Sequence, residues 1–313
     1  MPAQSDTSRL TLVEYGLIAA IAVIWGANNA AAKVATQVLP PMLTACLRFA
    51  IAAALLAPFA LGPLPRTRKL GLLMLLAGPV HFSLIYFGFS IAHDLSPISV
   101  SLQLWIPMTA LASWIFLKEP LSRAAITGML AAFGGIIVMV LDPHALRDWP
   151  SILVGALASA AWALATITAR QLPAVSALKI QGLTSFCAAL TFAVASAAFE
   201  RGRWGQLAHA DGLIWGAVVF SAVGSTVMAT AALFWLVQRR EAGRVTPYML
   251  TSPVVSMSIG VLFLGDIITP QILAGALLCM GGVAIVAVAE RRRVVAPEQA
   301  ASEAAVEGAG STA

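Results

Sequence analysis

Residues 102–140, LQLWIPMTALASWIFLKEPLSRAAITGMLAAFGGIIVMV, return about 147 positions later as residues 248–287, YMLTSPVVSMSIGVLFLGDIITPQILAGALLCMGGVAIVA. The alignment keeps helix-breaking, acidic and small residues in equivalent places. The matched residues are Pro107 with Pro253, Glu119 with Asp266, Gly128 with Gly275, and Gly134-Gly135 with Gly281-Gly282. This internal repeat predicts a structural unit that occurs twice in the chain.

The composition places that unit in a membrane. Of the 313 residues, 59% are hydrophobic and 11% are charged, and the mean hydropathy is +0.88. Soluble proteins have about half apolar and a quarter charged residues. Apolar runs long enough to span hydrocarbon as helices occupy residues 12–36, 42–61, 70–92, 98–117, 123–141, 151–171, 177–199, 212–237, 246–264 and 270–289. The sequence therefore predicts an all-α integral membrane protein with ten transmembrane helices.

The repeat contains five helices. We expect the first copy at 12–141 and the second at 151–289, between a cytoplasmic N-terminus at 1–11 and a disordered cytoplasmic tail at 290–313. Because five is odd, the second copy must enter the membrane from the side opposite the first. Inverted-topology repeats around a central cavity are typical of transporters.

The net charge of +5 reflects topology. With the N-terminus in the cytoplasm, 14 of the 19 Lys and Arg residues fall at the inner ends of the expected helices, four fall outside, and Arg48 lies within the second helix. This bias favours cytoplasmic placement of both termini. The basic residues therefore do not indicate a nucleic-acid partner.

Several energy sources are not indicated. No Gly-rich phosphate-binding loop ending in Lys-Ser or Lys-Thr occurs, so ATP is not an expected partner. None of the 14 acidic residues falls in the interior of an expected helix, where proton or sodium coupling usually recruits carboxylates. The transport modes that remain are facilitated diffusion, exchange, or weak coupling to protons through a His. The three cysteines, Cys46, Cys187 and Cys279, lie in expected helices, where we interpret them as packing residues. No metal or cofactor site is expected.

Two ionisable side chains stand inside expected helices. His81, near the middle of the third, fits a neutral ring bonded to a neighbouring helix, a residue lining the substrate path, or a proton-coupling group. Arg48, about two turns into the second, must reach the interface or find a partner. It either bonds backbone carbonyls and snorkels, or contacts a substrate carboxylate.

Several motifs together resemble those of one family. IWGANNAAAK at 24–33 resembles the first-helix signature of the drug/metabolite transporter (DMT) superfamily in its EamA-type branch, and LRFAIAAALL at 47–56 resembles its second helix. Residues 107–140 are similar to its fourth and fifth helices, and residues 252–286 to the matching part of its second repeat. Asp266 stands where that family usually shows Glu. Within that branch, the sequence resembles the YddG-type bacterial exporters of aromatic amino acids and similar metabolites.

The resemblance implies a ten-helix carrier in a bacterial inner membrane, with its cavity between the two halves and its fifth and tenth helices at the periphery. It also implies export of small organic metabolites by alternating access. The superfamily moves amino acids, sugar conjugates and drugs, so the resemblance leaves the substrate open.

The first helix of each repeat carries a candidate substrate contact. Trp25 and Trp162 occupy equivalent places, and each is followed eight positions later by a basic residue, Lys33 or Arg170. Asn28 adds an amide that is costly to bury without a partner. An aromatic face with a few fixed polar groups suits an apolar amino acid, although Trp at such places also serves core packing.

Two helices broken by proline carry polar stripes. The fourth has Ser99 and Gln103 between Pro97 and Pro107. The ninth has Tyr248, Ser252 and Ser256 beside Pro247 and Pro253. Broken helices can hold an anionic group at a helix N-terminus. Ser side chains at such places also join helices by hydrogen bonds, so both interpretations stay open for the serines.

The ends of these helices are candidate gates. Glu119 is expected at the inner face and Asp266 at the outer, where each acid could pair with a loop cation and latch one gate, or remain solvated. Gly134-Gly135 and Gly281-Gly282 indicate tight helix packing or, less simply, a hinge. The Gly212-x-x-x-Gly216 motif offers only a weak dimer contact, so we expect a monomer or weak dimer.

Taken together, these features predict a non-enzymatic exporter of amino acids, aromatic or hydrophobic, and related metabolites. The first alternative is a multidrug efflux carrier, which would accept cationic aromatics. A membrane enzyme would need a nucleophile, metal cluster or acid pair, and none is evident. A scaffold without transport would not explain the paired Trp residues.

Overall fold

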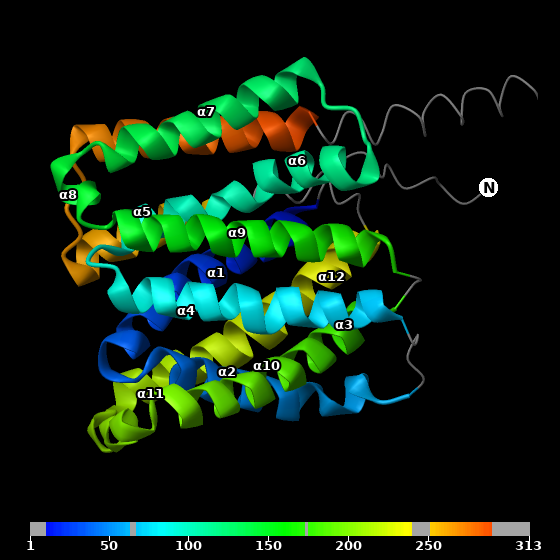
Figure 1. Cartoon of the computed structure of the whole chain (residues 1–313), viewed down its shortest axis with the longest axis vertical. Helices are drawn as coiled ribbons and strands as arrows, with labels where there is room; N and C mark the ends of the chain where they lie inside the picture. Colours follow the sequence, from blue (N-terminus) through cyan, green and yellow to red (C-terminus); the bar gives the residue numbers. More distant parts are fainter. Residues whose placement is uncertain (1–10, 63–66, 173–174, 240–250, 290–313) are drawn as a thin grey trace, which may run out of the picture.

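The computed structural model describes residues 11–62, 67–172, 175–239 and 251–289, and the regular elements in these ranges are helices. Nine helices in this part are long and apolar enough to cross a membrane, and a shorter apolar helix, Ser252–Leu264, stands in ninth place. The helices lie side by side with their axes roughly parallel (Figure 1). The predicted all-helical, multi-span architecture is confirmed.

The elements follow the predicted order. In the first repeat, the first two spans are α1 (Leu12–Val38) and α2 (Pro41–Ala60), and the fifth is α7 (Arg123–Val140). The third span is made of α3 (Arg68–Leu75), the π-helix η1 (Leu76–Val80) and α4 (His81–Ile91). The fourth is made of α5 (Leu95–Ser101), the 3-10 turn η2 (Leu102–Leu104) and α6 (Trp105–Leu117). The short α8 (Pro143–Leu146) connects the repeats.

The second repeat has the same number of spans. Its sixth and seventh spans are α9 (Trp149–Arg170) and α10 (Ala177–Phe199), followed by the 3-10 segment η3 (Arg201–His209). The eighth span is made of α11 (Gly212–Val219), the π-helix η4 (Phe220–Ala229) and α12 (Thr230–Arg239). The ninth is made of α14 (Ser252–Ile259) and η6 (Gly260–Leu264), and the tenth is the helix Pro270–Ala289. The predicted tail at 290–313 lies outside the described residues.

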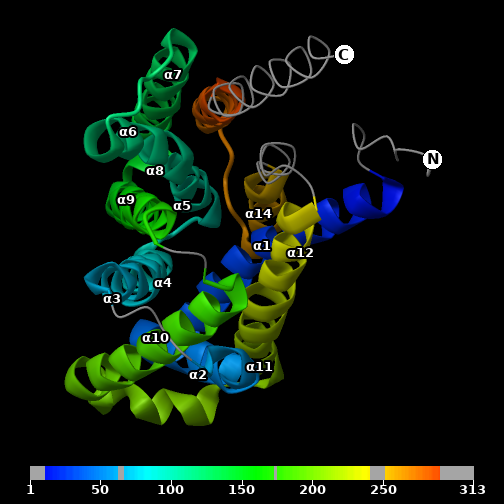
Figure 2. The same cartoon turned by 90° about the vertical axis from the view of Figure 1, so that its right-hand side faces the viewer.

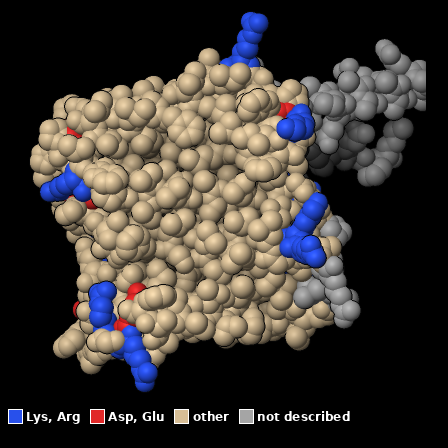
Figure 3. Space-filling view, in the orientation of Figure 1, with Lys and Arg blue, Asp and Glu red and all other residues tan. Residues whose placement is uncertain are grey.

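Charge is distributed as a membrane requires. Figure 3 shows Lys, Arg, Asp and Glu gathered toward the two ends of the molecule, with a broad uncharged band between them. We name the left end of Figure 1, which carries α8, the α8 face, and the opposite end, where α1 begins, the terminal face. Large apolar side chains are exposed along the band, as expected for contact with lipid tails; they include Leu130, Ile137, Phe186, Leu190 and Leu277.

Contacts at the helix ends show that the two repeats run in opposite directions. Lys33, near the end of α1, donates from Nζ to the carbonyl oxygens of Ala92 (2.8 Å) and His93 (2.7 Å). The backbone N–H of His93 in turn donates to Asp148, immediately before α9, at 2.6 Å. The end of α1 and the start of α9 therefore lie at the same face. The inverted arrangement follows from this pairing.

The second helices of the repeats are paired in the same antiparallel way. Glu200, just after α10, accepts hydrogen bonds from the backbone N–H groups of Met42 (3.0 Å) and Leu43 (2.9 Å) at the start of α2. The α2 helix begins at Pro41 and has no side-chain cap of its own. A carboxylate from the other repeat satisfies donors that every helix start leaves free.

The fifth helices pack backbone to backbone. A Cβ atom at Gly128 would lie 2.7 Å from the carbonyl oxygen of Gly282, and one at Gly275 would lie 2.6 Å from that of Gly135. Gly134 and Gly281 have nothing within 4 Å of the equivalent position. The prediction of tight packing is therefore correct for one glycine of each pair, Gly135 and Gly282. This helix pair forms the upper edge of the molecule in Figure 1.

The fourth span is interrupted near Pro107, as its sequence predicts. The 3-10 turn at Leu102–Leu104 separates α5 from α6. Ser159 of α9 donates its hydroxyl to the carbonyl oxygens of Ser101 (3.2 Å) and Leu102 (2.9 Å). A neighbouring helix thus bonds the irregular backbone, which makes the break tolerable within a membrane span.

Helices from both repeats interleave around the centre. Seen from the terminal face, Figure 2 places α3, α4 and α9 on one side and α1, α12 and α14 on the other. The broken span α5 packs against both α9 and α14. Residues of the first and second repeats are therefore brought together at each side of the molecule.

Candidate functional site

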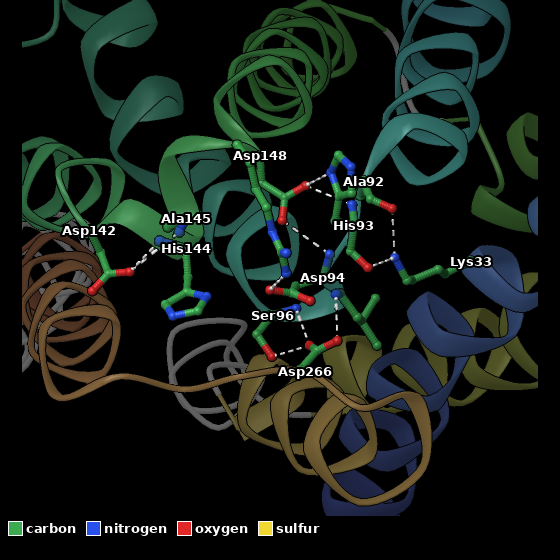
Figure 4. A network of polar contacts seen from close by, with 12 residues as sticks. Lys33, Ala92, His93, Asp94, Ser96, Asp142, His144, Ala145, Asp148 and Asp266 are labelled. Atoms are coloured by element: carbon green, nitrogen blue, oxygen red, sulfur yellow. Dashed lines mark hydrogen bonds and ion pairs between the residues drawn. The ribbon is translucent and has the colours of Figure 1, made fainter.

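A polar network lies at the α8 face. We call it the α8-face network, and its members are Lys33, His93, Asp94, Ser96, Arg147, Asp148 and Asp266 (Figure 4). They come from α1, the loop between α4 and α5, the first turn of α5, the segment between α8 and α9, and the loop after η6. The network thus joins the two repeats at one end of the membrane.

Asp266 links the two repeats through three hydrogen bonds. Its carboxylate accepts hydrogen bonds from the backbone N–H of Leu95 (3.0 Å), the backbone N–H of Ser96 (2.7 Å) and the Ser96 hydroxyl. These groups open α5, whose own N-cap residue, Asp94, makes no side-chain cap. A carboxylate at a helix start satisfies free donors and interacts favourably with the helix dipole. The end of the ninth span therefore caps the start of the fourth.

Asp94 and Asp148 fix the loop that precedes α5. The Asp148 carboxylate accepts from the backbone N–H groups of His93 (2.6 Å) and Asp94 (3.0 Å). Arg147 donates from Nη2 to Asp94 at 3.0 Å. Burial raises the pKa of the Asp94 carboxyl, and the hydrogen bond from Arg147 opposes that shift. These contacts hold the loop between α4 and α5 against the start of α9.

Lys33 is a buried member of this network. Only 1% of its surface is exposed, and its ammonium bonds the two carbonyl oxygens at the end of α4. A cation is favourable there because the carbonyl end of a helix carries partial negative charge. Arg170, its equivalent in the second repeat, lies at the terminal face.

At the terminal face, Arg170 forms a bidentate ion pair with Glu119. The distances are 2.7 Å from Nη2 to Oε1 and 3.2 Å from Nη1 to Oε2. The sequence-based expectation that an acid at this helix end pairs with a cation is met by Glu119. For Asp266 it is wrong, because its hydrogen-bond partners are the N–H groups and hydroxyl at the start of α5.

In the membrane interior, His81 contacts two aromatic side chains. Its ring centroid lies 4.8 Å from those of Phe82 and Trp162. Nδ1 lies 2.8 Å from the carbonyl oxygen of Ala158, so Nδ1 carries the proton and donates. The sequence-predicted pair His81 and Trp162 is thus brought together, and His81 is bonded to a neighbouring helix.

Arg48 lies close to this aromatic group. Nε donates to Thr226 Oγ1 (3.0 Å), Nη1 to Tyr86 OH (3.3 Å), and Nη2 to Ser225 Oγ (3.5 Å). The guanidinium carbon lies 5.1 Å from the ring centroid of Phe82. The expected alternatives for Arg48 did not include these hydroxyl partners, which come from helices distant in sequence and form no motif.

Exposure divides the nine predicted substrate contacts. Five of them are partly exposed: Trp25, Asn28, His81, Gln103 and Trp162. Three are buried, namely Ser99, Ser252 and Ser256, and Tyr248 lies outside the described residues.

Ser256 joins two helices. It donates to the carbonyl oxygen of Gly26 (2.9 Å) and accepts from Asn29 Nδ2 (3.1 Å). A Cβ atom at Gly26 would lie 2.6 Å from the carbonyl oxygen of Ser252. Gly26 therefore permits α1 and α14 to touch, and Asn29, which the sequence did not single out, completes the contact.

Two predicted contacts have polar atoms that the fold leaves unsatisfied. Asn28 Oδ1 and Ser99 Oγ are buried and have no hydrogen-bond partner among the described residues. Buried polar atoms in proteins are nearly always bonded, so such exceptions need an explanation. Both belong to helices that the sequence marks as lining the substrate path.

Known proteins resemble the chain over most of its length. It is 27% identical to the "Probable amino-acid metabolite efflux pump" of Salmonella typhimurium (strain LT2) over 85% of this chain and 91% of that one. An "Uncharacterized transporter" of Archaeoglobus fulgidus is 26% identical over 86% and 97% of the two chains. "Uncharacterized transporter YvbV" of Bacillus subtilis (strain 168) is 25% identical over 86% and 90%.

A solved structure described as "Crystal structure of protein" shares the fold. It matches with a TM-score of 0.60 at 19% identity and covers 90% of this chain and 98% of that one. Residues 12–141 and 149–288 each match the EamA-like transporter family, so that the two matches include both repeats. With two such regions in one all-helical chain, the protein belongs to the EamA-like transporter family.

Proposed function

We propose that this transporter exports amino acids with aromatic or hydrophobic side chains, and related small metabolites, from the cytoplasm by alternating access. The observation that carries the proposal is the contact between His81 and Trp162 in the membrane interior, where both are partly exposed. A flat ring pair beside polar groups suits a small molecule with an apolar part. The name of the Salmonella relative supports the amino-acid class.

The two faces supply the gates. The excess of Lys and Arg at the expected inner helix ends supports a topology with the terminal face in the cytoplasm and the α8 face outside. The α8-face network then holds the outer gate closed, with Asp266 capping α5 as its central contact. Substrate that enters from the cytoplasm leaves after this network separates. A carrier that exchanges between two such states needs only a small free-energy difference between them.

Multidrug efflux is the alternative within the family. Its cationic aromatic substrates would be attracted by a buried carboxylate, whereas the ionised group described at the membrane interior is Arg48. A fixed positive charge repels a cation and attracts a carboxylate. This observation favours amino acids and other carboxylates.

The proposal is tested by counterflow in liposomes. Purified protein is reconstituted with unlabelled amino acid inside, and uptake of labelled phenylalanine, tryptophan, leucine and alanine is followed with and without a pH gradient. Saturable exchange is expected to be fastest for the aromatic amino acids. Exchange of cationic dyes without exchange of any amino acid would overturn the proposal in favour of multidrug efflux.

A pair of tryptophan variants makes the test specific. Trp162→Ala is expected to slow exchange because Trp162 contacts His81. Trp114→Ala is the matched control, since Trp114 is 51% exposed on the outer surface of α6. His81→Ala separates coupling from binding: if a pH gradient drives uptake by wild type and His81→Ala equally, His81 does not carry the proton.

A further inference from the structure

Arg48 is a buried charge with neutral partners. It lies about 10 Å along α2 from the first residue of the helix, at about 1.5 Å per residue, and only 4% of its surface is exposed. Its three hydrogen-bond acceptors are the hydroxyl oxygens of Tyr86, Ser225 and Thr226. Ion pairs of the described residues occur elsewhere, for example at His93–Asp148, Arg147–Asp94 and Arg170–Glu119. Among the described residues, no carboxylate pairs with the guanidinium of Arg48.

A merely structural role would not require this charge. An amide or hydroxyl could bond three neutral oxygens without the desolvation that a cation suffers in hydrocarbon. Ionised side chains inside membrane spans generally mark the path of a substrate or ion. The charge is explained if an anion occupies the site during part of the transport cycle.

The site retains donors for such an anion. A guanidinium has five N–H groups, and three are directed to Tyr86, Ser225 and Thr226. One N–H remains on each of Nη1 and Nη2, and guanidinium N–H groups of this kind donate to carboxylate oxygens. The contact of Nη2 with Ser225, at 3.5 Å, is at the limit of a hydrogen bond and is easily exchanged.

The hydroxyl groups around Arg48 have different roles. Thr226 donates to the carbonyl oxygen of Ser221 at 3.0 Å, so its hydroxyl is fixed as the acceptor for Nε. The hydroxyl hydrogens of Tyr86 and Ser225 have no acceptor among the contacts of the described residues. Both can donate to an anion held by Nη1 and Nη2. Thr226 thus anchors the guanidinium while Tyr86 and Ser225 complete an anion site.

Aromatic rings connect this site with the proposed substrate path. The ring of Phe82 lies 5.1 Å from the guanidinium carbon of Arg48 and 4.8 Å from the ring of His81, which in turn lies 4.8 Å from Trp162. Phe82, His81 and Trp162 are partly exposed, whereas Arg48 is buried behind them. A ligand that reaches Arg48 therefore carries its negative group past a series of apolar rings.

We propose that Arg48, Tyr86 and Ser225 form a binding site for the carboxylate of the transported molecule, whose apolar part packs on Phe82, His81 and Trp162. This inference rests on the proposed function and narrows it to substrates that carry a carboxylate. Two flanking segments are π-helical: η1, just before His81, and η4, which holds Ser225 and Thr226. Such wide turns occur frequently at functional sites.

The test compares an acid with its amide. L-Phenylalanine and L-phenylalaninamide share the ring and the amino group, and only the first has a carboxylate. In liposomes, wild-type protein is expected to exchange phenylalanine with a higher apparent affinity than phenylalaninamide. Arg48→Met is expected to lower the apparent affinity for phenylalanine by about tenfold or more, as for a lost charge-assisted contact. The apparent affinity for phenylalaninamide is expected to stay nearly unchanged. Arg123→Met, which removes an exposed cation from the start of α7, is the matched control.

The outcomes separate the site from the fold. Equal losses for the acid and the amide would mean that Arg48 only supports the structure, and the inference would be overturned. If Arg48→Met does not fold, Arg48→Lys, Tyr86→Phe and Ser225→Ala replace it, and each is expected to lower affinity for the acid alone. An equal loss for both compounds in these variants would overturn the inference as well.

A second measurement keeps the inference distinct from the proposed function. If wild-type protein exchanges no amino acid, the proposed function fails while the carboxylate site remains open to test. Thermal unfolding is then measured with 3-phenylpropanoate and with 3-phenylpropanamide. Stabilisation of wild type by the acid alone, reduced in Tyr86→Phe, supports the site. Equal stabilisation by both compounds, or by neither, overturns it.

Discussion

The carboxylate of Asp266 holds the backbone N–H and hydroxyl of Ser96, although the two residues stand 170 positions apart in the chain. Asp266 ends the ninth span and Ser96 belongs to the first turn of the fourth. These are equivalent spans of the two repeats, placed antiparallel. The contact therefore depends directly on the relative position of the repeats, and under the proposed alternating access it changes when the α8 face opens.

Asp266→Asn is expected to favour opening of the α8 face. Asparagine keeps the size of the side chain but removes the charge that stabilises the start of α5, a change of about 1–2 kcal/mol, or about five- to thirtyfold in the equilibrium between the states. Ser99→Cys, at a fully buried position of α5, reports opening through its reaction with a membrane-impermeant maleimide. The native cysteines are replaced by alanine for this measurement.

Asp211→Asn is the control for Asp266→Asn. Asp211 also caps a helix start, by accepting from the backbone N–H of Ile214 at 3.0 Å, but both residues belong to the same span. It should lower stability without changing the labelling of Ser99→Cys. Equal labelling of all three proteins would show that the Asp266 contact does not control the gate.

Gly260→Ala should reproduce the effect of Asp266→Asn. A Cβ atom at Gly260 would collide with the Asp266 carboxylate and approach Ser96 Oγ, so the carboxylate must leave its position. The double variant should label no faster than either single variant, because both changes remove the same contact. Additive acceleration in the double variant would mean that Gly260 acts elsewhere.

Gly135→Ala and Gly134→Ala should differ although the residues are neighbours. The added methyl group at Gly135 meets the backbone of Gly275 and Cys279, whereas at Gly134 nothing lies within 4 Å. Overpacking of this kind costs about 1–3 kcal/mol, and alanine in an open helix position is favoured over glycine by up to about 1 kcal/mol. Thermal unfolding in detergent should therefore show a lower Tm for Gly135→Ala and an unchanged or higher Tm for Gly134→Ala. Equal Tm values would contradict close packing of this helix pair.

Asp142 makes stability depend on pH in the acidic range. The hydroxyl of Thr269 donates to its carboxylate at 2.6 Å, and this bond, helped by the backbone N–H of His144, holds its pKa below the ordinary value of 3.8. Stability from this group is present above its unfolded pKa and is lost as pH falls through the lower folded pKa. Thr269→Val removes the main cause of the lowered pKa of Asp142, and this variant should be less stable than wild type near pH 7.

The Tm difference between wild type and Thr269→Val decides that prediction. It should shrink as pH falls from about 7 to below the ordinary pKa of 3.8, because protonation of Asp142 removes the charge that the Thr269 hydroxyl stabilises. A Tm difference that stays constant over this range would assign the effect of Thr269 to packing instead of charge.

The fold could be predicted because its evidence is local or repeated. Runs of apolar residues mark the spans, Pro107 marks the break in the fourth, and the matched Glu119 and Asp266 mark equivalent helix ends. The odd number of helices per repeat then requires inversion. What the sequence does not indicate are the π-helices at Leu76–Val80, Phe220–Ala229 and Gly260–Leu264, because a widened turn depends on packing between helices.

The site could be predicted only in part. His81 and Trp162 stand out as polar or aromatic residues in apolar helices, and the structure places them in contact. Tyr86 and Ser225 do not stand out, since a tyrosine and a serine in a membrane span are common, and only the fold brings them to Arg48. The partner of Asp266 was missed because backbone N–H groups at a helix start have no sequence signature.

The helix-end contacts also say what each half of the chain lacks. Glu200 of the second repeat caps α2 of the first, and the backbone of the helix Pro270–Ala289 fills the glycine face of α7. A separate first half would leave helix starts without acceptors and a backbone surface without its partner. Each half therefore supplies helix caps and packing surfaces to the other, as the subunits of an antiparallel dimer do.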